Sequence, residues 1–521
     1  MKRIIPLILA LVLIFALTAC NKTPASGGAG SGGSTNNGGG SASGGGSSEV
    51  DKSKLEPYTV DFYHICWWNT PTDEGIKGVE DAINEYVQKT LGYPYTLKLH
   101  FLAIMEYTTQ IDLLLAAGDK IDLVSEFSYD SMVVNGYLLP LDQFLDKELA
   151  DTAELLGDWL ESGRTKGVTY GIPCHKGVVL TYCYEYQDSY INGINYDMSK
   201  IKDFYDLEDL YAKLHAKYPN IWVDVDCSRY PDMIAQLNKV TVVGTYGCTL
   251  GDNSTLVSYY ESDAWKQALD YAWKYRNNGY VDPEGSQSQK ATTALTPEML
   301  VGYNIAYGRD PAAQGVWLTT SWNVPCSAVT TCVQNLTVGG GAKWGIAYTS
   351  KNPSASATLL NLMWTDYFVL NTLMYGIEGR DYVVTEATKD YTPAGIGAYE
   401  YPEGFDGDSV PYQCQLNDGI FGDEFLMLRS SGTTSYTRQY MQEQIDKAWK
   451  CPTFGFTPDT ADVQNQLTAL SNINSQYRSA LCYGDINPSE NATFVKLLKE
   501  AGVDDVIANY NQQIQEWLAA K

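Results

Sequence analysis

The alternation of strand-like and helix-like segments over residues 58–124 constrains the fold more than any other feature of this sequence. Residues 58–67 form a continuous β-prone run, which is typical of a strand buried on both faces. A segment that opens at Asp73 has apolar residues three and four positions apart and predicts a helix. A strand over 97–101, a short helix and a strand over 121–124 follow. This order predicts a parallel sheet with helices on both faces.

Parallel sheets of this kind bind ligands beyond the carboxyl ends of their strands, where the first loops emerge. Adjacent side chains of a strand point to opposite faces, so two neighbouring indoles cannot both face one core. Aromatic rings with a polar tip, placed beside fixed polar groups, suit the recognition of polar ligands. The predicted ligand-binding residues of these loops are Trp67, Trp68, Asn69, Glu126, Ser128 and Tyr129. The alternatives are core indoles for the tryptophans and an ordinary solvated loop for Glu126, Ser128 and Tyr129.

The first nineteen residues read as a signal peptide, because Lys2 and Arg3 precede an apolar run that is too short to span a bilayer comfortably. The run ends in Leu17-Thr18-Ala19-Cys20, which resembles the lipobox of bacterial lipoproteins. That resemblance implies a lipid on Cys20, and the alternative is an ordinary signal peptide followed by a chance cysteine. Residues 20–56 then form a tether, because 21–49 are almost wholly small or polar and cannot bury apolar area.

Composition excludes some classes of partner. Lys and Arg number 36 against 62 Asp and Glu, a net charge of −26, which disfavours binding to nucleic acid or to anionic lipid. The 39 Tyr and 12 Trp residues suit surfaces that recognise polar ligands. Ten cysteines remain besides Cys20, without a C-x-x-C motif, and their wide spacing leaves both disulfides and free thiols open.

The remainder of the chain mixes both kinds of element. A strand is expected over 178–184, helices are expected around 204–214 and 263–275, and 344–376 is rich in helical pattern. Apolar residues at helical spacing from 494 to 518 predict a terminal helix.

Several stretches, in this order, resemble the extracellular solute-binding proteins of ABC sugar importers (solute-binding family 1). Residues 118–124 are similar to the signature G-D-x-P-D-hydrophobic, with Ile121 in place of Pro, and 135–142 to G-x-L-x-P-L-D. Residues 167–173 are similar to G-K-x-Y-G-I-P, with Val168 in place of Lys. Blocks at 350–380 and 455–503 resemble the LipO-like lipoprotein subgroup, which is found mainly in Gram-positive bacteria.

The resemblance implies an α/β fold with two lobes of the periplasmic-binding-protein type (type II), joined by a hinge and closing over a ligand. It places lobe one at 57–174 plus 345–405, and lobe two at 175–344 plus 406–521. The implied function is capture of a sugar or oligosaccharide at the outer face of the cytoplasmic membrane. The implied partners are this carbohydrate, the ABC permease with its ATPase, and the membrane through the lipid anchor; we expect a monomer without a cofactor and without nucleic acid.

Further candidates lie beyond the presumed crossover between lobes. His175 is expected to line the hinge, and Trp317 and Trp322, in a loop-like stretch, are expected to form a facing platform. Trp222 stands beside Asp224 and Asp226 and is a fourth candidate. The alternative for each is a structural role. Glu378 and Arg380, in a family-like block, are expected to form an ion pair rather than ligand contacts.

Enzyme motifs are missing from the sequence. It has no H-E-x-x-H, no G-x-S-x-G and no phosphate-binding G-x-x-x-x-G-K-[ST], and its four His are too scattered to suggest a metal site. A glycosidase that uses two of the many carboxylates stays open as an alternative, as does a peptide-binding receptor of the same fold.

Overall fold

The computed structural model describes residues 51–520 apart from several gaps, so the predictions on the signal peptide, Cys20 and the tether lie outside the described residues. The gaps are 67–69, 127–128, 176–178, 180, 225–226, 282–299, 308–310, 337–341, 386–396, 414–420 and 431–435. Trp67, Trp68, Asn69 and Ser128 therefore also lie outside them. Within the described part, no helix is both long enough and apolar enough to cross a membrane.

The first sheet contains the predicted parallel strands. Its order is β2 (Tyr95–Ala103), β1 (Tyr58–Cys66), β3 (Leu123–Glu126), β13 (Lys343–Ile346) and β6 (Ile172–Pro173). Strand β1 pairs in parallel with β2 and with β3, which confirms the predicted alternation. Strand β13 returns from more than 200 residues later and pairs antiparallel with β3, which the helix-rich pattern after residue 344 did not predict.

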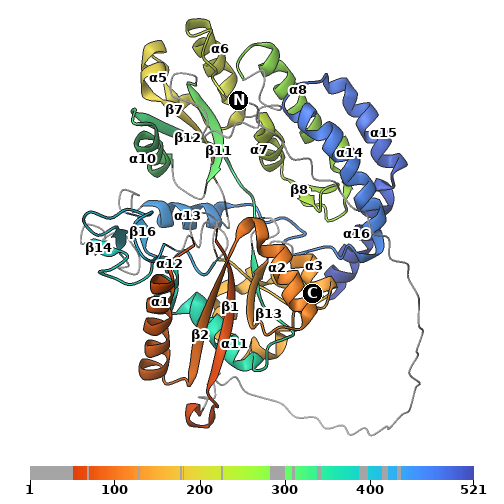
Figure 1. Ribbon diagram of the computed structural model, residues 1–521. Coiled ribbons are helices and arrows are strands. Elements are labelled where there is room, and N and C mark those ends of the chain that lie inside the picture. The colour runs from red at the N-terminus through yellow and green to blue at the C-terminus, as the bar shows by residue number, and fades with distance from the viewer. Residues whose placement is uncertain are drawn as a thin grey trace, which may run out of the picture. The chain divides into compact units, whose positions relative to one another are not determined.

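Helices cover both faces of this sheet (Figure 1). They are α1 (Asp73–Glu85, continued by the turn Tyr86–Thr90), α2 (Ile104–Ala117), α3 (Tyr129–Val134), α4 (Ala150–Leu156), α11 (Pro353–Thr365) and α12 (Tyr367–Tyr375). Helix α1 begins where predicted because the Thr72 side chain caps the N–H of Gly75. The core beneath the helices is aromatic: Phe62 stacks on Trp344 with ring centres 4.7 Å apart, and Phe421 meets Trp344 edge-on at 5.4 Å.

A second sheet is antiparallel and has the order β11 (Gly302–Tyr307), β7 (Thr181–Gln187) and β12 (Cys326–Val333). The strand expected over 178–184 thus lies at 181–187. Around it are α5 (Asp188–Ile194), α6 (Leu207–Lys217), α7 (Tyr230–Leu237), α8 (Asp263–Asn277), α10 (Pro311–Trp322), α14 (Gln464–Cys482), α15 (Asn491–Glu500) and α16 (Val503–Ala520). The predicted terminal helix is two helices, because Gly502 adopts a φ of +94° that ends α15 and lets α16 begin.

Smaller elements complete the described part. They are the sheets β8 (Val240–Val243), β9 (Gly247–Leu250) with β10 (Val257–Ser258); β14 (Val383–Thr385), β15 (Ala398–Glu400) with β16 (Arg429–Ser430); the hairpin β4 (Arg164–Thr165) and β5 (Val168–Thr169); and α13 (Tyr436–Lys447).

Two large hydrophobic cores accompany the two main sheets. The first core gathers residues of 60–174 and 344–427, and the second core gathers residues of 182–332 and 456–514. Tyr412, Phe421 and Met427 pack in the first core. The lobe boundaries stay a prediction, and this packing favours a boundary later than the one expected near residue 405.

The linking segment, residues 449–459, contacts both cores. Phe456 is buried in the second core, whereas the ring of Phe454 lies 5.2 Å from Trp159, which packs against the first core. Ion pairs join Lys450 to Asp158 and Lys166 to Asp459 on either side of this contact.

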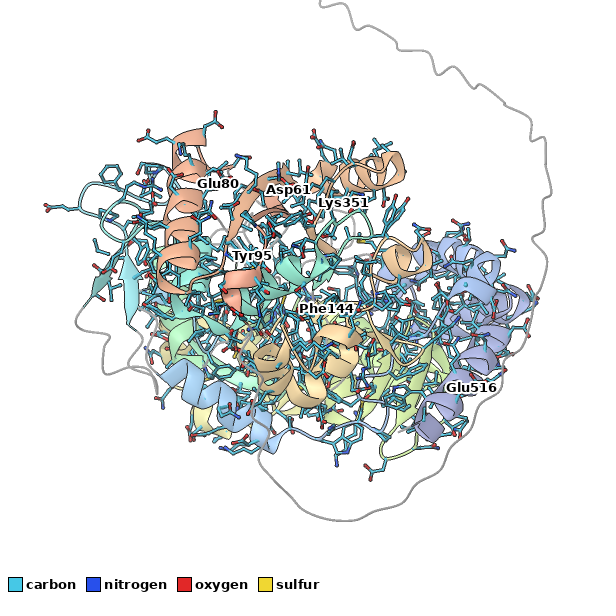
Figure 2. The ribbon with its side chains drawn as sticks, turned by 90° about the horizontal axis from the view of Figure 1, so that it is seen from below. Asp61, Glu80, Tyr95, Phe144, Lys351 and Glu516 are labelled. Atoms are coloured by element: carbon cyan, nitrogen blue, oxygen red, sulfur yellow. The ribbon has the colours of Figure 1, made fainter. Side chains whose placement is uncertain are left out.

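A network of charged side chains lies where the parallel strands of the first sheet begin, which we call its amino edge. Figure 2 views the molecule from this side and labels Asp61 and Lys351. Asp61 accepts hydrogen bonds from His100 at 2.8 Å and from Lys120 at 2.5 Å. Burial opposes ionisation of Asp61, but these two hydrogen bonds outweigh it and lower the pKa of the carboxyl. The network pairs charges at the edge opposite to the one where ligand loops were predicted.

Candidate functional site

Four strand ends meet at the side of the first sheet where its parallel strands terminate, which we call the carboxyl edge. Lys343, the first residue of β13, pairs with Glu126 at the end of β3 and with Pro173 at the end of β6. Strand β1 runs parallel to β3, so Cys66 ends at this edge as well. The predicted residues that follow these strands are Trp67, Trp68 and Asn69 after β1, Ser128 and Tyr129 after β3, and His175 after β6. The strands β1, β3 and β6 therefore end at one edge, as the parallel topology requires. That Trp67, Trp68, Asn69 and Ser128 share this edge with Tyr129 and His175 stays a prediction.

Tyr129 has a structural environment at this edge. Its side chain is buried, and its hydroxyl donates to the carbonyl oxygen of Gly163 at 2.5 Å. The Lys343 ammonium lies 5.0 Å from the centre of the ring, a cation–π distance. Tyr129 thus has a structural role through its contacts with Gly163 and Lys343. Its contact with a ligand stays a prediction. Glu126 ends β3 as expected, but its side chain is outside the described set.

His175 is held by Asp423, a residue that no local sequence pattern indicated. Its Nδ1 lies 2.8 Å from Oδ1 of Asp423, and Phe425 packs with its ring centre 5.3 Å from the imidazole. The backbones of His175 and Asp423 also form an isolated parallel bridge. A carboxylate can only accept, so Nδ1 carries the proton in this pair. Asp423 and Phe425 were missed because they lie some 250 residues away and no local motif marks them.

Trp222 and Trp322 come together, but elsewhere. Both pack on a small cluster formed by Leu300, Tyr303, Leu318 and Cys326. Cys326 pairs with Gln187 at the carboxyl end of β7, whereas Thr181 at its amino end lies nearest in the chain to His175. Seven residues of strand span roughly 20 Å, so these two indoles lie at the end of the second sheet that is remote from the crossover.

Trp317 is not in a loop, as the Thr- and Ser-rich stretch suggested. It lies in α10, which runs from Pro311 to Trp322. The segment is helical because α10 packs on β12, where Gly315 lies over Ser327 closely enough that a Cβ would be 3.0 Å from its Cα. Tertiary packing thus overrides the weak helix propensity of Thr and Ser.

Asp224, beside Trp222, is a buried structural acceptor. It receives hydrogen bonds from the hydroxyls of Tyr211 at 2.8 Å and Tyr230 at 3.0 Å, and from Nδ2 of Asn304 at 2.7 Å. Burial, with the Asp224 charge adding to it, raises the pKa of both tyrosines well above the ordinary value. This carboxylate is fully engaged within the protein, while Asp226 lies outside the described residues.

The predicted ion pair between Glu378 and Arg380 is wrong. Arg380 pairs with its neighbour Asp381, whose Oδ2 lies 2.6 Å from Nη2, and it also donates to the carbonyl oxygen of Gly75. Asp381 is the partner because its side chain is buried beside Arg380, where a directly paired cation offsets the loss of water contacts.

The cysteine chemistry, left open by the sequence, is decided for nine residues. The nine are buried and are not joined to one another in disulfides: Cys66, Cys174, Cys183, Cys227, Cys248, Cys326, Cys332, Cys451 and Cys482. Among the described residues, no group of three or more His, Cys, Asp or Glu side chains is arranged to hold a metal ion.

Comparisons with known proteins identify one matching family model and a relative that covers most of the chain. Residues 452–519 match the family model DUF3502, a domain of unknown function. A carbohydrate ABC transporter substrate-binding protein of Streptococcus pneumoniae is 19% identical over 449 residues, which cover 84% of this chain and 87% of the relative.

Solved structures show the same fold. The N-glycan transport solute-binding protein NgtS of Streptococcus pneumoniae has a TM-score of 0.72 at 19% identity, covering 89% of this chain and 99% of its own. The alginate-binding protein AlgQ2 has a TM-score of 0.58 at 14% identity, covering 90% and 100%. The chain therefore has the predicted two-lobed α/β fold of the extracellular solute-binding proteins, and it is a homologue of a carbohydrate ABC transporter substrate-binding protein.

Proposed function

We propose that this protein is the extracellular substrate-binding component of an ABC importer and captures an oligosaccharide. The observation that carries the proposal is the similarity to a carbohydrate substrate-binding protein over 84% of the chain. Structural relatives that include an N-glycan transport protein, an alginate-binding protein and a substrate-binding protein in complex with kestose favour an oligosaccharide over a single sugar.

The carboxyl edge of the first sheet is the proposed floor of the ligand site. Trp67 and Trp68 supply ring faces for C–H groups, and Asn69 and Glu126 supply partners for hydroxyls. The His175–Asp423 pair lies where the chain leaves the first sheet for β7, so we assign it to the hinge. A binding protein of this kind performs no covalent step, and its work is a higher affinity for ligand in the closed arrangement of the lobes.

The proposed location is the outer face of the cytoplasmic membrane. Cys20 carries the lipid, and the small polar residues that follow act as a flexible leash. The proposed partners are the permease and ATPase subunits, which a monomer would meet with the outer faces of both lobes. Palmitate labelling of cells that express the whole chain should be lost in Cys20→Ala, and labelling that persists would contradict the anchor.

Binding without turnover is the decisive test of the function. The protein from residue 21 onward is titrated by calorimetry with N-glycan, milk, alginate and fructan oligosaccharides. Each mixture is then analysed for shortening of the oligosaccharide. Saturable binding of at least one of them with the glycan recovered intact supports a receptor. Hydrolysis of the glycan would contradict the receptor proposal and would indicate a glycosidase. Binding of peptides alone would contradict the oligosaccharide as ligand and would indicate a peptide-binding receptor.

Trp67→Ala and Trp68→Ala test the site itself. Loss of one stacked ring should weaken binding by about 1 kcal/mol or more, roughly fivefold to tenfold. The matched control is Trp322→Phe, which changes an indole at the remote end of the second sheet and should leave affinity unchanged. Equal affinities in all three variants would remove the edge of the first sheet from the site.

A further inference from the structure

A pocket of about 230 Å³ lies between α14 and the turn Cys227–Arg229. Its lining combines polar groups with apolar surface and consists of Ser228, Asn474, Ser475, Arg478, Ser479, Cys482 and Tyr483. Its helix belongs to the stretch 452–519 that matches the domain of unknown function, and it packs over the second core. The pocket is thus separate from the carboxyl edge of the first sheet.

Arg478 is the cation of this pocket. Its guanidinium makes no ion pair at salt-bridge distance with a carboxylate of the described residues; the carboxylate that acts on it through space is Asp232. Arg164 and Arg276, by contrast, have direct carboxylate partners, Glu161 and Asp485, each at 2.8 Å. In a chain with 62 acidic and 36 basic residues, a half-buried guanidinium without a direct carboxylate partner is conspicuous.

The helix holds its polar groups on one face. Asn474, Arg478 and Cys482 are spaced by four residues, and Ser475 and Ser479 form the adjacent row. Behind them Tyr260 is buried, donates to Oδ1 of Asn474 at 2.9 Å, and lies within hydrogen-bond reach of Arg478. The guanidinium therefore stands on a fixed support, which reduces the entropy that a ligand must remove.

The chemistry of the lining selects an anion with hydroxyls. A guanidinium presents donors in a planar fork that matches a carboxylate, and serine hydroxyls and an amide both donate and accept. The volume is below the range of about 300–1,000 Å³ of drug-sized pockets, so the occupant is small. We propose that this pocket binds a small hydroxylated carboxylic acid of the uronic-acid class, with its carboxylate on Arg478.

Sodium glucuronate is the probe, with glucose as the neutral ring of the same size and sodium sulfate as the bare anion. Ionic strength is held constant with sodium chloride, because screening alone shifts the stability of so acidic a chain. Calorimetry on the chain from residue 21 onward should show one saturable site for glucuronate and much weaker binding of glucose. Tighter binding of sulfate than of glucuronate would overturn the uronic-acid assignment, and no preference for glucuronate over glucose would overturn the anion site.

Variants locate the site. Arg478→Gln removes the charge but leaves a hydrogen-bonding amide, and it should weaken glucuronate binding about tenfold or more, while Arg478→Lys, which keeps the charge, should weaken it less. The control is Lys496→Gln, an exposed cation of α15 whose side chain is 75% accessible, and it should bind as the parent does. Unchanged affinity in Arg478→Gln would overturn the proposal.

The Trp67→Ala/Trp68→Ala double variant separates this site from the proposed transport site. It should retain glucuronate binding while it loses the oligosaccharide. Loss of glucuronate in this variant, with retention in Arg478→Gln, would mean that the acid binds at the sheet edge and would overturn the pocket assignment alone.

Discussion

At the scale of single residues, the buried thiols have a direct chemical consequence. Burial raises the pKa of Cys66 to about 11 and the pKa of Cys248, Cys326 and Cys332 to about 12. Only the thiolate is nucleophilic, so these groups are protected both by exclusion of reagent and by protonation.

We therefore expect the nine described thiols to resist a disulfide reagent such as DTNB at pH 8 in the native protein. In guanidinium chloride the same thiols should all react within minutes, and non-reducing mass spectrometry should find no disulfide among them. Rapid labelling of several cysteines in the native state would contradict the burial described here.

His64 gives the chain a site of acid sensitivity. It is fully buried in β1 between aromatic rings, with Trp344 at 5.2 Å, and neither ring nitrogen has a hydrogen-bond partner among the described residues. Burial lowers its pKa from 6.5 to about 3. The unfolded chain therefore binds a proton below about pH 6.5 that the folded chain refuses, and stability is lost as the pH falls from there towards 3.

His64→Phe should remove this contribution. Between pH 7 and pH 4.5 the free energy of unfolding in urea should fall by roughly 2–3 kcal/mol less in the variant than in the parent. The parent chain, measured in parallel, is the control, because it shares every other ionisable group with the variant. An equal loss in the parent and in His64→Phe would show that this imidazole does not titrate as described.

At the scale of elements, glycines mark where backbones meet. Gly455 in the linking segment has a φ of +86°, and a Cβ there would lie 2.3 Å from the Cβ of Glu161 in the turn Gly157–Gly163. Gly136 has a similar φ of +70° with nothing within 4 Å of such a Cβ. The two positions therefore share the backbone strain of a substitution and differ in the steric overlap.

Gly136→Ala should cost about 1 kcal/mol of unfolding free energy from the left-handed backbone alone. Gly455→Ala should cost at least 1–2 kcal/mol more, since the overlap with Glu161 forces the linking segment away from the first core. Thermal and urea unfolding measure both variants side by side. Equal costs would mean that the linking segment does not pack against this turn.

At the scale of the whole molecule, charge is the dominant feature. A net charge of −26 at pH 7 repels itself most strongly in the compact state. We expect the melting temperature, measured by scanning calorimetry at pH 7, to rise by several degrees between 10 mM and 300 mM sodium chloride. A melting temperature that falls with salt would indicate instead that the ion pairs of the folded chain outweigh the repulsion.

The sequence by itself determined what depends on neighbours in the chain. The order of β1, α1, β2, α2 and β3 follows from hydrophobic periodicity, and the meeting of the strands' carboxyl ends at one edge follows from parallel topology. The family-like motifs likewise led to the two-lobed fold.

Only the tertiary structure decided which distant segments pair. The return of Lys343–Ile346 to the first sheet, the choice of Asp423 for His175 and of Asp381 for Arg380, and the helical state of Trp317 have no local signature. The same holds for Trp222 and Trp322, whose clustering at the remote end of the second sheet depends on strand register. Such contacts are selected by burial and charge compensation after the chain has collapsed, and those energies depend on three-dimensional neighbours that periodicity and composition do not encode.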